Sequence, residues 1–178
     1  MTQAIHRAIA VSLGLTFNSY TANARILRAY AAPPPPQQDR ETNLCFFDLS
    51  PDPSAPMHTE RHLKQGSNFF HRYIPCILTL VFYGPSAQTD AIMVRENFFV
   101  DGKNKPRSIL RGVGLYPVPP VRPPSVVYEE EGSLFRKRAD LVIPMRLLDN
   151  SDDPNTGSAF SLPGNLIYTP PDIDIHSR

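Results

Sequence analysis

The feature that most constrains the fold is a long apolar stretch, residues 68–83, near the middle of the 178-residue chain. One of its two alternating sets of side chains consists of Ile74, Cys76, Leu78, Leu80 and Phe82. Alternate side chains of a strand point to opposite faces, so this pattern predicts a long β-strand. The second set is also largely apolar, which predicts a central strand covered on both faces. Pro75 has no N–H to donate and predicts an edge-like or bulged point within the strand.

Two helices are predicted. The first covers residues 2–13, where apolar residues recur at helical spacing and Thr2 suits the N-cap. The second covers residues 87–99 and follows the turn at Gly84, with Ser86 as N-cap and Asp90 in the first turn. The N-terminal apolar run has a faint resemblance to a signal peptide, but it is short and lacks a strong basic region. No stretch approaches about 20 apolar residues, so no membrane span is predicted.

The other expected strands cover residues 24–30 (for which a helix is the alternative), 43–49, 109–118, 126–128 and 134–148. Residues 50–66 are predicted to form a polar connection. The predicted fold class is α+β, with a mainly antiparallel sheet of four to five strands and one or two helices packed on a face. Pro-rich arms and a C-terminal extension complete it. Residues 1–148 are expected to form the domain, and residues 149–178 an extension that docks on neighbours.

Proline and charge limit the functional classes. The chain has 20 Pro against 9 Gly, and proline-rich segments are stiff, so they lose less entropy when they lie on a partner. Lys and Arg number 18 and Asp and Glu 17, a net charge of +1. This balance argues against a strongly basic nucleic-acid binder, although a local basic patch remains compatible with it.

No residue pattern indicates catalysis, and neither an enzyme nor a cofactor is predicted. A glycine-rich phosphate loop and a serine nucleophile motif are both missing from the sequence. His58, His62 and His71 with Glu60 are candidate ligands of a metal ion, but a solvated loop is the preferred interpretation and no metal is predicted.

The two cysteines, Cys45 and Cys76, lie in apolar runs and are predicted to be buried free thiols. A disulfide would require their strands to lie side by side. Two pairs of adjacent aromatics, at residues 69–70 and 98–99, are predicted to belong mostly to the core.

Charged residues near the end of the chain have two open interpretations each. Arg136, Arg138 and Arg146 occupy even positions of one strand and share a face. That face is either solvated and balanced by Asp140, or a channel wall exposed to a partner or to passing DNA. The acidic run at residues 129–131 is either a solvated turn or an ionic contact with a neighbour's basic edge.

Four short motifs follow one another along residues 24–148. They are Ala31-Ala32-Pro33-Pro34-Pro35-Pro36, Phe82-Tyr83-Gly84, Ala87-Gln88-Thr89-Asp90-Ala91 and Leu134-Phe135-Arg136-Lys137-Arg138-Ala139-Asp140-Leu141. Their order and spacing resemble the neck or tail terminator proteins of tailed bacteriophages. Those proteins often have Trp where Phe135 stands, and residues 149–178 have no counterpart in them.

The resemblance implies a structural virion protein that assembles in the host cytoplasm into a hexameric ring at the head–tail junction. The ring would end the tail tube, dock it to a head-side connector or stopper protein, and let DNA pass without specific binding. The expected contacts with other subunits or partners are Pro33, Pro34, Pro35, Pro36, Pro119, Pro120, Glu129, Glu130, Phe160 and Tyr168. The alternatives are another tail-tube or head-completion ring protein and, less favoured, a cellular partner-binding module with a deep apolar pocket.

Overall fold

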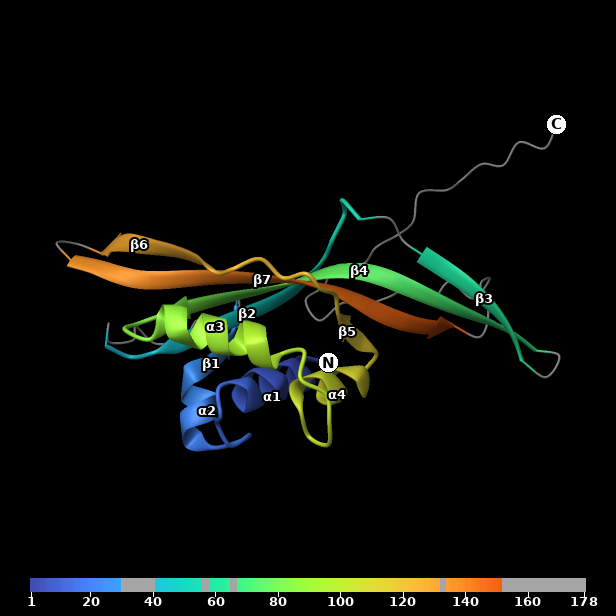
Figure 1. Cartoon of the computed structure of the whole chain (residues 1–178), viewed down its shortest axis with the longest axis horizontal. Coiled ribbons are helices and arrows are strands. Elements are labelled where there is room, and N and C mark those ends of the chain that lie inside the picture. The colour runs from blue at the N-terminus through green and yellow to red at the C-terminus, as the bar shows by residue number, and fades with distance from the viewer. Residues whose placement is uncertain (30–40, 56–57, 65–66, 132–133, 152–178) are drawn as a thin grey trace.

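The computed structural model describes residues 1–29, 41–55, 58–64, 67–131 and 134–151. In these ranges the helices lie on one side of a mixed sheet (Figure 1). The helices are α1 (Thr2–Ser12), α2 (Tyr20–Arg25), α3 (Ala87–Asn97) and α4 (Pro106–Arg111). The strands are β1 (Ile26–Arg28), β2 (Leu44–Pro51), β3 (His58–Lys64), β4 (Ser67–Tyr83), β5 (Leu115–Pro117), β6 (Ser125–Glu131) and β7 (Leu134–Ser151). The predicted α+β class is confirmed, although the described sheet has seven strands and more than two helices accompany it.

The centre of the sheet is the antiparallel ladder between β4 and β7, which runs from Phe70 opposite Ser151 to Tyr83 opposite Arg138. On its other edge, each of these two long strands pairs with one strand over its first half and with a different strand further along. β4 pairs with β3 over its first half and with β2 over its second half. β7 pairs with β6 over its first half and with β5 near its end. Among the described strands, the short ladder between β1 and β2 is the parallel one.

A proline marks each change of partner. The carbonyl of Pro75 accepts a hydrogen bond from the Asp52 N–H (3.0 Å), just beyond the end of β2. The carbonyl of Pro144 accepts one from the Val118 N–H (2.8 Å), just beyond the end of β5. In an antiparallel ladder the N–H and C=O of one residue point to the same side. Each proline nitrogen, which has no N–H to donate, therefore points to the side on which the neighbouring strand has already ended. This confirms the edge-like point predicted at Pro75.

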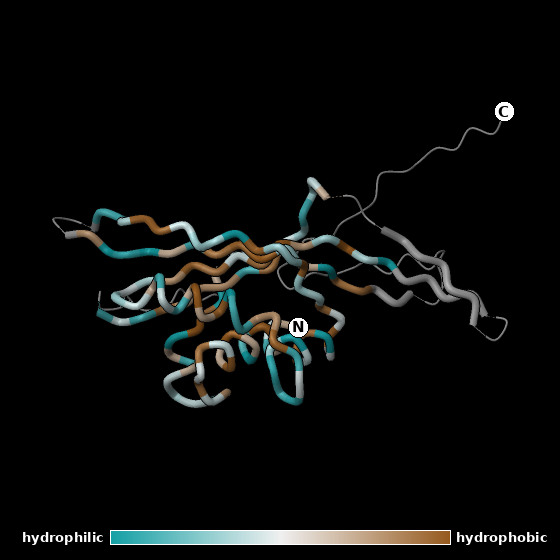
Figure 2. Tube along the Cα trace, in the orientation of Figure 1, coloured by the Kyte–Doolittle hydropathy of each residue, from teal (hydrophilic) through white to brown (hydrophobic). Residues whose placement is uncertain are grey.

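The core lies between the sheet and the helices. The inward-facing residues of β4 and β7, such as Leu78, Leu80, Leu141 and Ile143, are fully buried. Figure 2 shows hydrophobic residues concentrated in the central parts of these strands and in α1. No described helix covers the opposite face, where Val142 is 48% exposed. The position of residues 68–83 at the centre of the sheet and the helices on one face are as predicted, but the cover expected on the second face is wrong for the described part, where that face is partly exposed.

The turn between β4 and α3 requires glycine. Gly84 has a φ of +103°, and a Cβ there would lie 2.7 Å from both the Thr42 carbonyl oxygen and Asn43 Oδ1. Asn43 Oδ1 also accepts the Ser86 N–H (2.8 Å), so the residue directly before β2 fixes the start of α3. Ser86 is the N-cap as predicted, but its side chain makes no capping hydrogen bond, and α3 ends at Asn97 rather than residue 99.

Several expected boundaries differ from the structure. In the segment predicted as a strand at 24–30, residues 24–25 end α2 and residues 26–28 form β1, while residue 30 lies outside the described residues. Residues 109–118 include the end of α4 and all of β5. The connection predicted at residues 50–66 contains β3. At the N-terminus, Met1 rather than Thr2 is the N-cap of α1. β7 continues to Ser151, past the domain boundary predicted at residue 148.

Candidate functional site

The three arginines proposed for a channel wall lie on the helix-free face of β7. Their partners in the ladder show that they are spread along the strand. Arg138 lies opposite Tyr83, whereas Arg146 lies opposite Pro75. A strand rises about 3.3 Å per residue, so Arg136 and Arg146 are about 30 Å apart. Arg146 is exposed near β5, whereas Arg136 and Arg138 both lie at the Tyr83 ring.

Arg138 is neutralised by two carboxylates of its own chain. Its Nε and Nη2 atoms donate to Asp140 Oδ1 (2.6 Å) and Oδ2 (2.8 Å), and its Nη1 donates to Glu129 Oε1. These hydrogen bonds, to Asp140 first and then Glu129, raise the pKa of Arg138. The balancing role predicted for Asp140 is confirmed, and Glu129 shares it from β6. Glu129 itself is therefore engaged within its own chain, while its role toward a neighbour stays a prediction.

Arg136 packs on the Tyr83 ring, which Arg138 also approaches, at 5.9 Å from its centroid. Its guanidinium carbon lies 4.7 Å from the centroid of the Tyr83 ring, a cation–π distance. Phe46 meets the same ring edge-on, with 5.9 Å between centroids. We call Phe46, Tyr83, Arg136 and Arg138 the Tyr83 cluster. Burial, and then the negative charge of Glu129, raises the pKa of Tyr83.

The Nε and Nη2 atoms of Arg136 are buried and have no hydrogen-bond partner among the residues that the structure describes. Together they form the side-on fork with which a guanidinium binds a carboxylate or phosphate. Leaving two such donors unsatisfied is costly. Arg136 is thus the member of the Tyr83 cluster whose guanidinium donors are left unsatisfied within the described part of the chain.

Some of the other residues expected to contact neighbours lie within the described ranges. Pro119 and Pro120 are exposed in the connection between β5 and β6, and Glu130 is exposed on β6. The remaining ones, Pro33, Pro34, Pro35, Pro36, Phe160 and Tyr168, lie outside the described residues.

The β6–β7 hairpin exposes apolar side chains that the sequence pattern did not single out as a surface. Tyr128 is 64% exposed and Phe135 is 68% exposed. Phe135 shares the alternating set of the buried Ala139 and Leu141, so its pattern predicts an inward position. The hairpin extends beyond the helices (Figure 1), which is why the same face is buried at Leu141 and open at Phe135.

The histidines considered for a metal site do not lie on a loop. His58 and His62 belong to β3, which pairs with β4, so the solvated loop predicted there is wrong. On a strand, two residues four positions apart are separated by about 13 Å, too far for both to bind one metal ion. Among the residues whose side chains are described, no three His, Cys, Asp or Glu residues gather closely enough to hold a metal.

The prediction of two free, buried thiols is confirmed. β2 and β4 do lie side by side, but Cys45 faces Phe82 and Cys76 faces Pro51. The two thiols are therefore about 20 Å apart along the ladder, which excludes a disulfide between them. Burial raises the pKa of Cys76 to about 11 and also raises the pKa of Cys45.

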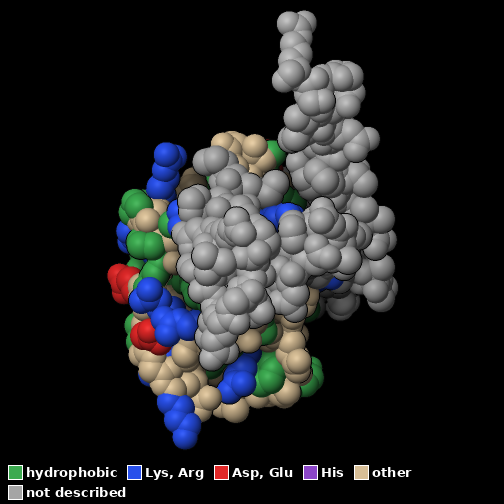
Figure 3. Space-filling model, turned by 90° about the vertical axis from the view of Figure 1, so that its right-hand side faces the viewer, with side chains coloured by type: hydrophobic (Ala, Val, Ile, Leu, Met, Phe, Trp, Pro, Cys, Tyr) green, Lys and Arg blue, Asp and Glu red, His purple; other side chains and the backbone are tan. Residues whose placement is uncertain are grey.

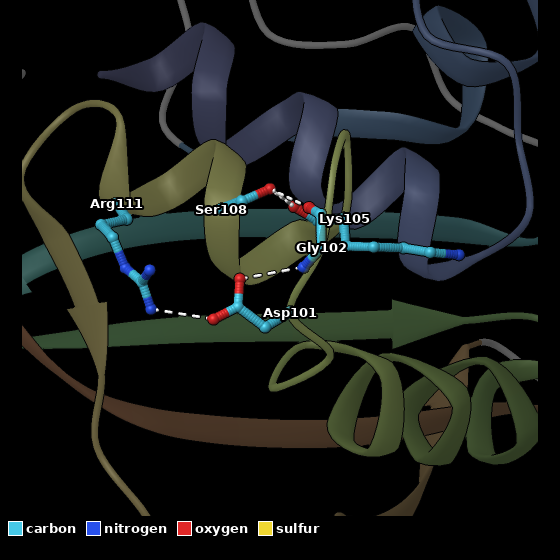
Figure 4. A network of polar contacts seen from close by, with 5 residues as sticks. All are labelled: Asp101, Gly102, Lys105, Ser108 and Arg111. Atoms are coloured by element: carbon cyan, nitrogen blue, oxygen red, sulfur yellow. Dashed lines mark hydrogen bonds and ion pairs between the residues drawn. The ribbon is translucent and has the colours of Figure 1, made fainter.

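A polar network closes the loop between α3 and α4 (Figure 4). Asp101 Oδ1 accepts the Gly102 N–H and Asp101 Oδ2 accepts Arg111 Nη2, both at 2.9 Å. The Ser108 hydroxyl lies 2.5 Å from the Gly102 carbonyl oxygen and 2.9 Å from that of Lys105. The Gly102 N–H and, less strongly, Arg111 lower the pKa of Asp101. These contacts join the loop to α4, and we assign the network a structural role.

A groove of about 480 Å³ separates the start of α1 from α4. Its wall includes Arg7, whose guanidinium lies 5.7 Å from the Phe17 ring centroid and donates to Asn104 Oδ1 (3.2 Å). The groove is open and partly polar. It does not match the deep apolar pocket expected of a small-molecule binding module.

No protein-family model matches the chain, and a search of curated proteins found no match to it. None of the helices in the described ranges is long and apolar enough to cross a membrane. Figure 3, which views the end of the molecule that carries β3, shows Lys and Arg side chains more often than Asp and Glu on the described surface.

Proposed function

We propose that this chain is a structural subunit of a ring at the head–tail junction of a tailed bacteriophage. The ring, a hexamer, would terminate the tail tube and dock it to the head-side connector or stopper protein, with DNA passing through its centre. The subunit would be assembled in the host cytoplasm and remain in the virion. The motifs along residues 24–148 suggest this function.

The observation that carries the proposal is the placement of unpaired strand edges. β6 lies at one end of the β4–β7 ladder and β3 at the other, and each pairs with a single strand in the described part (Figure 1). A closed ring requires two different, complementary surfaces on every subunit. Edge strands on opposite sides of one sheet supply two such surfaces.

The charge of the helix-free face supports a DNA channel. Arg138 is neutralised by Asp140 and Glu129, so little positive charge remains around it. Arg136 and Arg146 are far apart and cannot clamp one phosphate together. A wall of this kind attracts passing phosphates weakly, as a channel requires, because tight binding would hold the DNA.

The proline-rich connection before β6 supports contacts with neighbours. Pro119 and Pro120 are exposed, and Pro123 and Pro124 follow them directly before the edge strand. A stiff segment loses little conformational entropy when it is covered by a partner. We extend the same role to Pro33–Pro36, which lie outside the described residues.

Electron microscopy of virus particles made with and without this chain tests the proposal. Without the chain, we expect DNA-filled heads and tails that remain separate, with tails of irregular length. Supplying the chain should restore joined particles, and antibody labelling should place it at the junction. Normal joined virions in the absence of the chain would contradict the proposal.

A further inference from the structure

The two edge strands have matching lengths and compatible directions. β3 and β6 each contain seven residues. β3 is antiparallel to β4, β4 to β7, and β7 to β6, so β3 and β6 run in opposite directions within one subunit. If a second subunit is placed beside the first in nearly the same orientation, its β3 runs antiparallel to the first subunit's β6. Neighbours in a ring of many copies differ by a modest rotation, so this geometry is suitable for them.

The two strands also have opposite charge. The sequence of β6 contains Glu129, Glu130 and Glu131 and neither Lys nor Arg. The sequence of β3 contains Arg61 and Lys64 against the single acid Glu60, and two histidines in addition. Attraction between an acidic and a basic edge selects this pairing and speeds the encounter.

Charge also disfavours the symmetric alternatives. A ladder between two copies of β6 would collect the glutamates of both strands without a cation in either. A ladder between two copies of β3 would collect the basic residues of both. Like charges across an interface are penalised, which suppresses wrong partners. The head-to-tail pairing of β6 with β3 avoids both penalties.

The exposed side chains of β6 provide apolar area for the contact. Val127 is 42% exposed and Tyr128 is 64% exposed, and as successive strand residues they point to opposite faces. A strand added at this edge would cover part of each. Pro123 and Pro124 precede the strand and limit the length of the edge, because a proline cannot donate to a ladder.

We propose that β6 of one subunit adds antiparallel to β3 of the next, so that the sheets of successive copies become continuous. The partner of each edge is therefore a second copy of this chain. This inference rests on the proposed ring in one respect, since it names the contact that joins its subunits. It concerns the strand contact alone and holds for an open chain of copies as well as for a closed ring.

Charge reversal tests the pairing. The acid-side variant is Glu130→Lys with Glu131→Lys, and the base-side variant is Arg61→Glu with Lys64→Glu. Each should lower the association constant of the full chain at least about tenfold, measured by sedimentation, because like charges then face each other. Combining the four changes in one chain, or mixing the two variants, should restore association. Glu96→Lys, on the exposed surface of α3, is the matched control and should leave association unchanged.

Cross-linking gives an independent result that does not depend on affinity. Val127→Cys and Thr59→Cys place one thiol on each edge, while the native Cys45 and Cys76 are buried. A short bis-maleimide should produce a ladder of multimers from the double variant and a single linked pair from a mixture of the single variants. Linked dimers from Val127→Cys alone would overturn the proposal, because they require β6 to meet β6.

The outcomes separate this inference from the proposed function. The strand pairing is overturned, and the proposed ring is not, if the wild type forms rings, both charge-reversal variants associate as the wild type does, and the double-cysteine variant gives no cross-linked multimers. Open chains that are sensitive to charge reversal and cross-link between β6 and β3 support the pairing and contradict the closed ring.

Discussion

Pro75 and Pro144 occupy diagonal positions on the paired strands β4 and β7, where Pro75 lies opposite Arg146 and Pro144 lies opposite Ile77. Each proline turns its missing donor toward the point where a neighbouring strand has ended. The two outer strands at each end of the ladder are therefore different strands: β2 and β6 at one end, β3 and β5 at the other. This arrangement places the acidic edge and the basic edge at opposite ends of the subunit.

Gly84→Ala should lower the free energy of unfolding by about 2–3 kcal/mol, because the new Cβ combines a positive φ with contact against the Thr42 carbonyl and Asn43. Gly14→Ala is the control, since Gly14 has a φ of +70° with open space around it. It should cost about 1 kcal/mol. Chemical denaturation measures both values, and equal losses would show that the close approach of Thr42 and Asn43 to Gly84 does not contribute to the free energy of unfolding.

Ile143→Asp should prevent folding, because it buries a lone charge opposite Leu78 in the core. Val142→Asp, at the next residue, faces the opposite side and is 48% exposed in the wild type. It should change the free energy of unfolding by less than about 1 kcal/mol. Circular dichroism and denaturation compare the two, and a folded Ile143→Asp protein would show that the strand faces are assigned the wrong way.

Two neighbouring arginines should respond oppositely to replacement by Met. Arg138→Met leaves Asp140 and Glu129 without their partner and should destabilise the subunit by about 1 kcal/mol, because the site is partly exposed. Arg136→Met removes two buried unsatisfied donors and should leave stability unchanged or raise it by up to about 1 kcal/mol. Both are measured on the dissociated subunit by denaturation. A large loss in Arg136→Met would mean that the wild-type guanidinium is satisfied by partners within the fold.

The native thiols should be nearly inert. With a pKa of about 11, Cys76 has roughly one thiolate in a thousand molecules at pH 8, and the pKa of Cys45 is raised as well. Reaction with a thiol reagent at that pH should be at least about a hundredfold slower in the native protein than after denaturation. Rapid labelling of either cysteine in the folded chain would contradict their buried positions in β2 and β4.

His6 should make the fold sensitive to mild acid. Burial lowers the pKa of His6 below its ordinary value of about 6.5, so the unfolded chain binds the proton more readily. Its contribution to stability is full above about pH 6.5 and is lost as the pH falls through the lowered pKa. Asp90 acts in the opposite sense at lower pH, because burial raises its pKa despite the Arg25 ion pair. Its contribution is present at low pH and lost as the pH rises through that raised pKa.

His6→Gln isolates the histidine contribution. Between about pH 7.5 and 5, the free energy of unfolding of the wild type should fall relative to that of His6→Gln. Denaturation at several pH values measures the difference. Parallel curves for the two proteins would show that His6 titrates alike in the folded and unfolded states.

The sequence pattern was informative wherever one face of an element is buried. β4, β7, α1 and α3 each repeat apolar residues at the period of their structure, and all were predicted close to their observed positions. α2 was missed although a local signal exists, because Ser19 accepts the Ala22 N–H as an N-cap. α4 likewise begins with Pro106 at its first turn, a recognised helix start.

β3 could not be predicted in the same way. Its sequence, HTERHLK, lacks an apolar alternation, and its strand conformation comes from pairing with the first half of β4. The contacts within the candidate site could not be predicted from the sequence either. Sequence spacing placed Arg136 and Arg138 on one face, but the ion pairs of Arg138 and the unsatisfied fork of Arg136 depend on Glu129 and Tyr83, which tertiary packing brings to them.

The most direct test of the assembly account is electron cryomicroscopy of the purified full-length chain, concentrated until it associates. The account predicts closed rings with a central hole and cyclic symmetry, hexameric in copy number, in which the sheet of each subunit continues into the next. Particles that remain single subunits at every concentration, or that form only two-fold dimers, would contradict it.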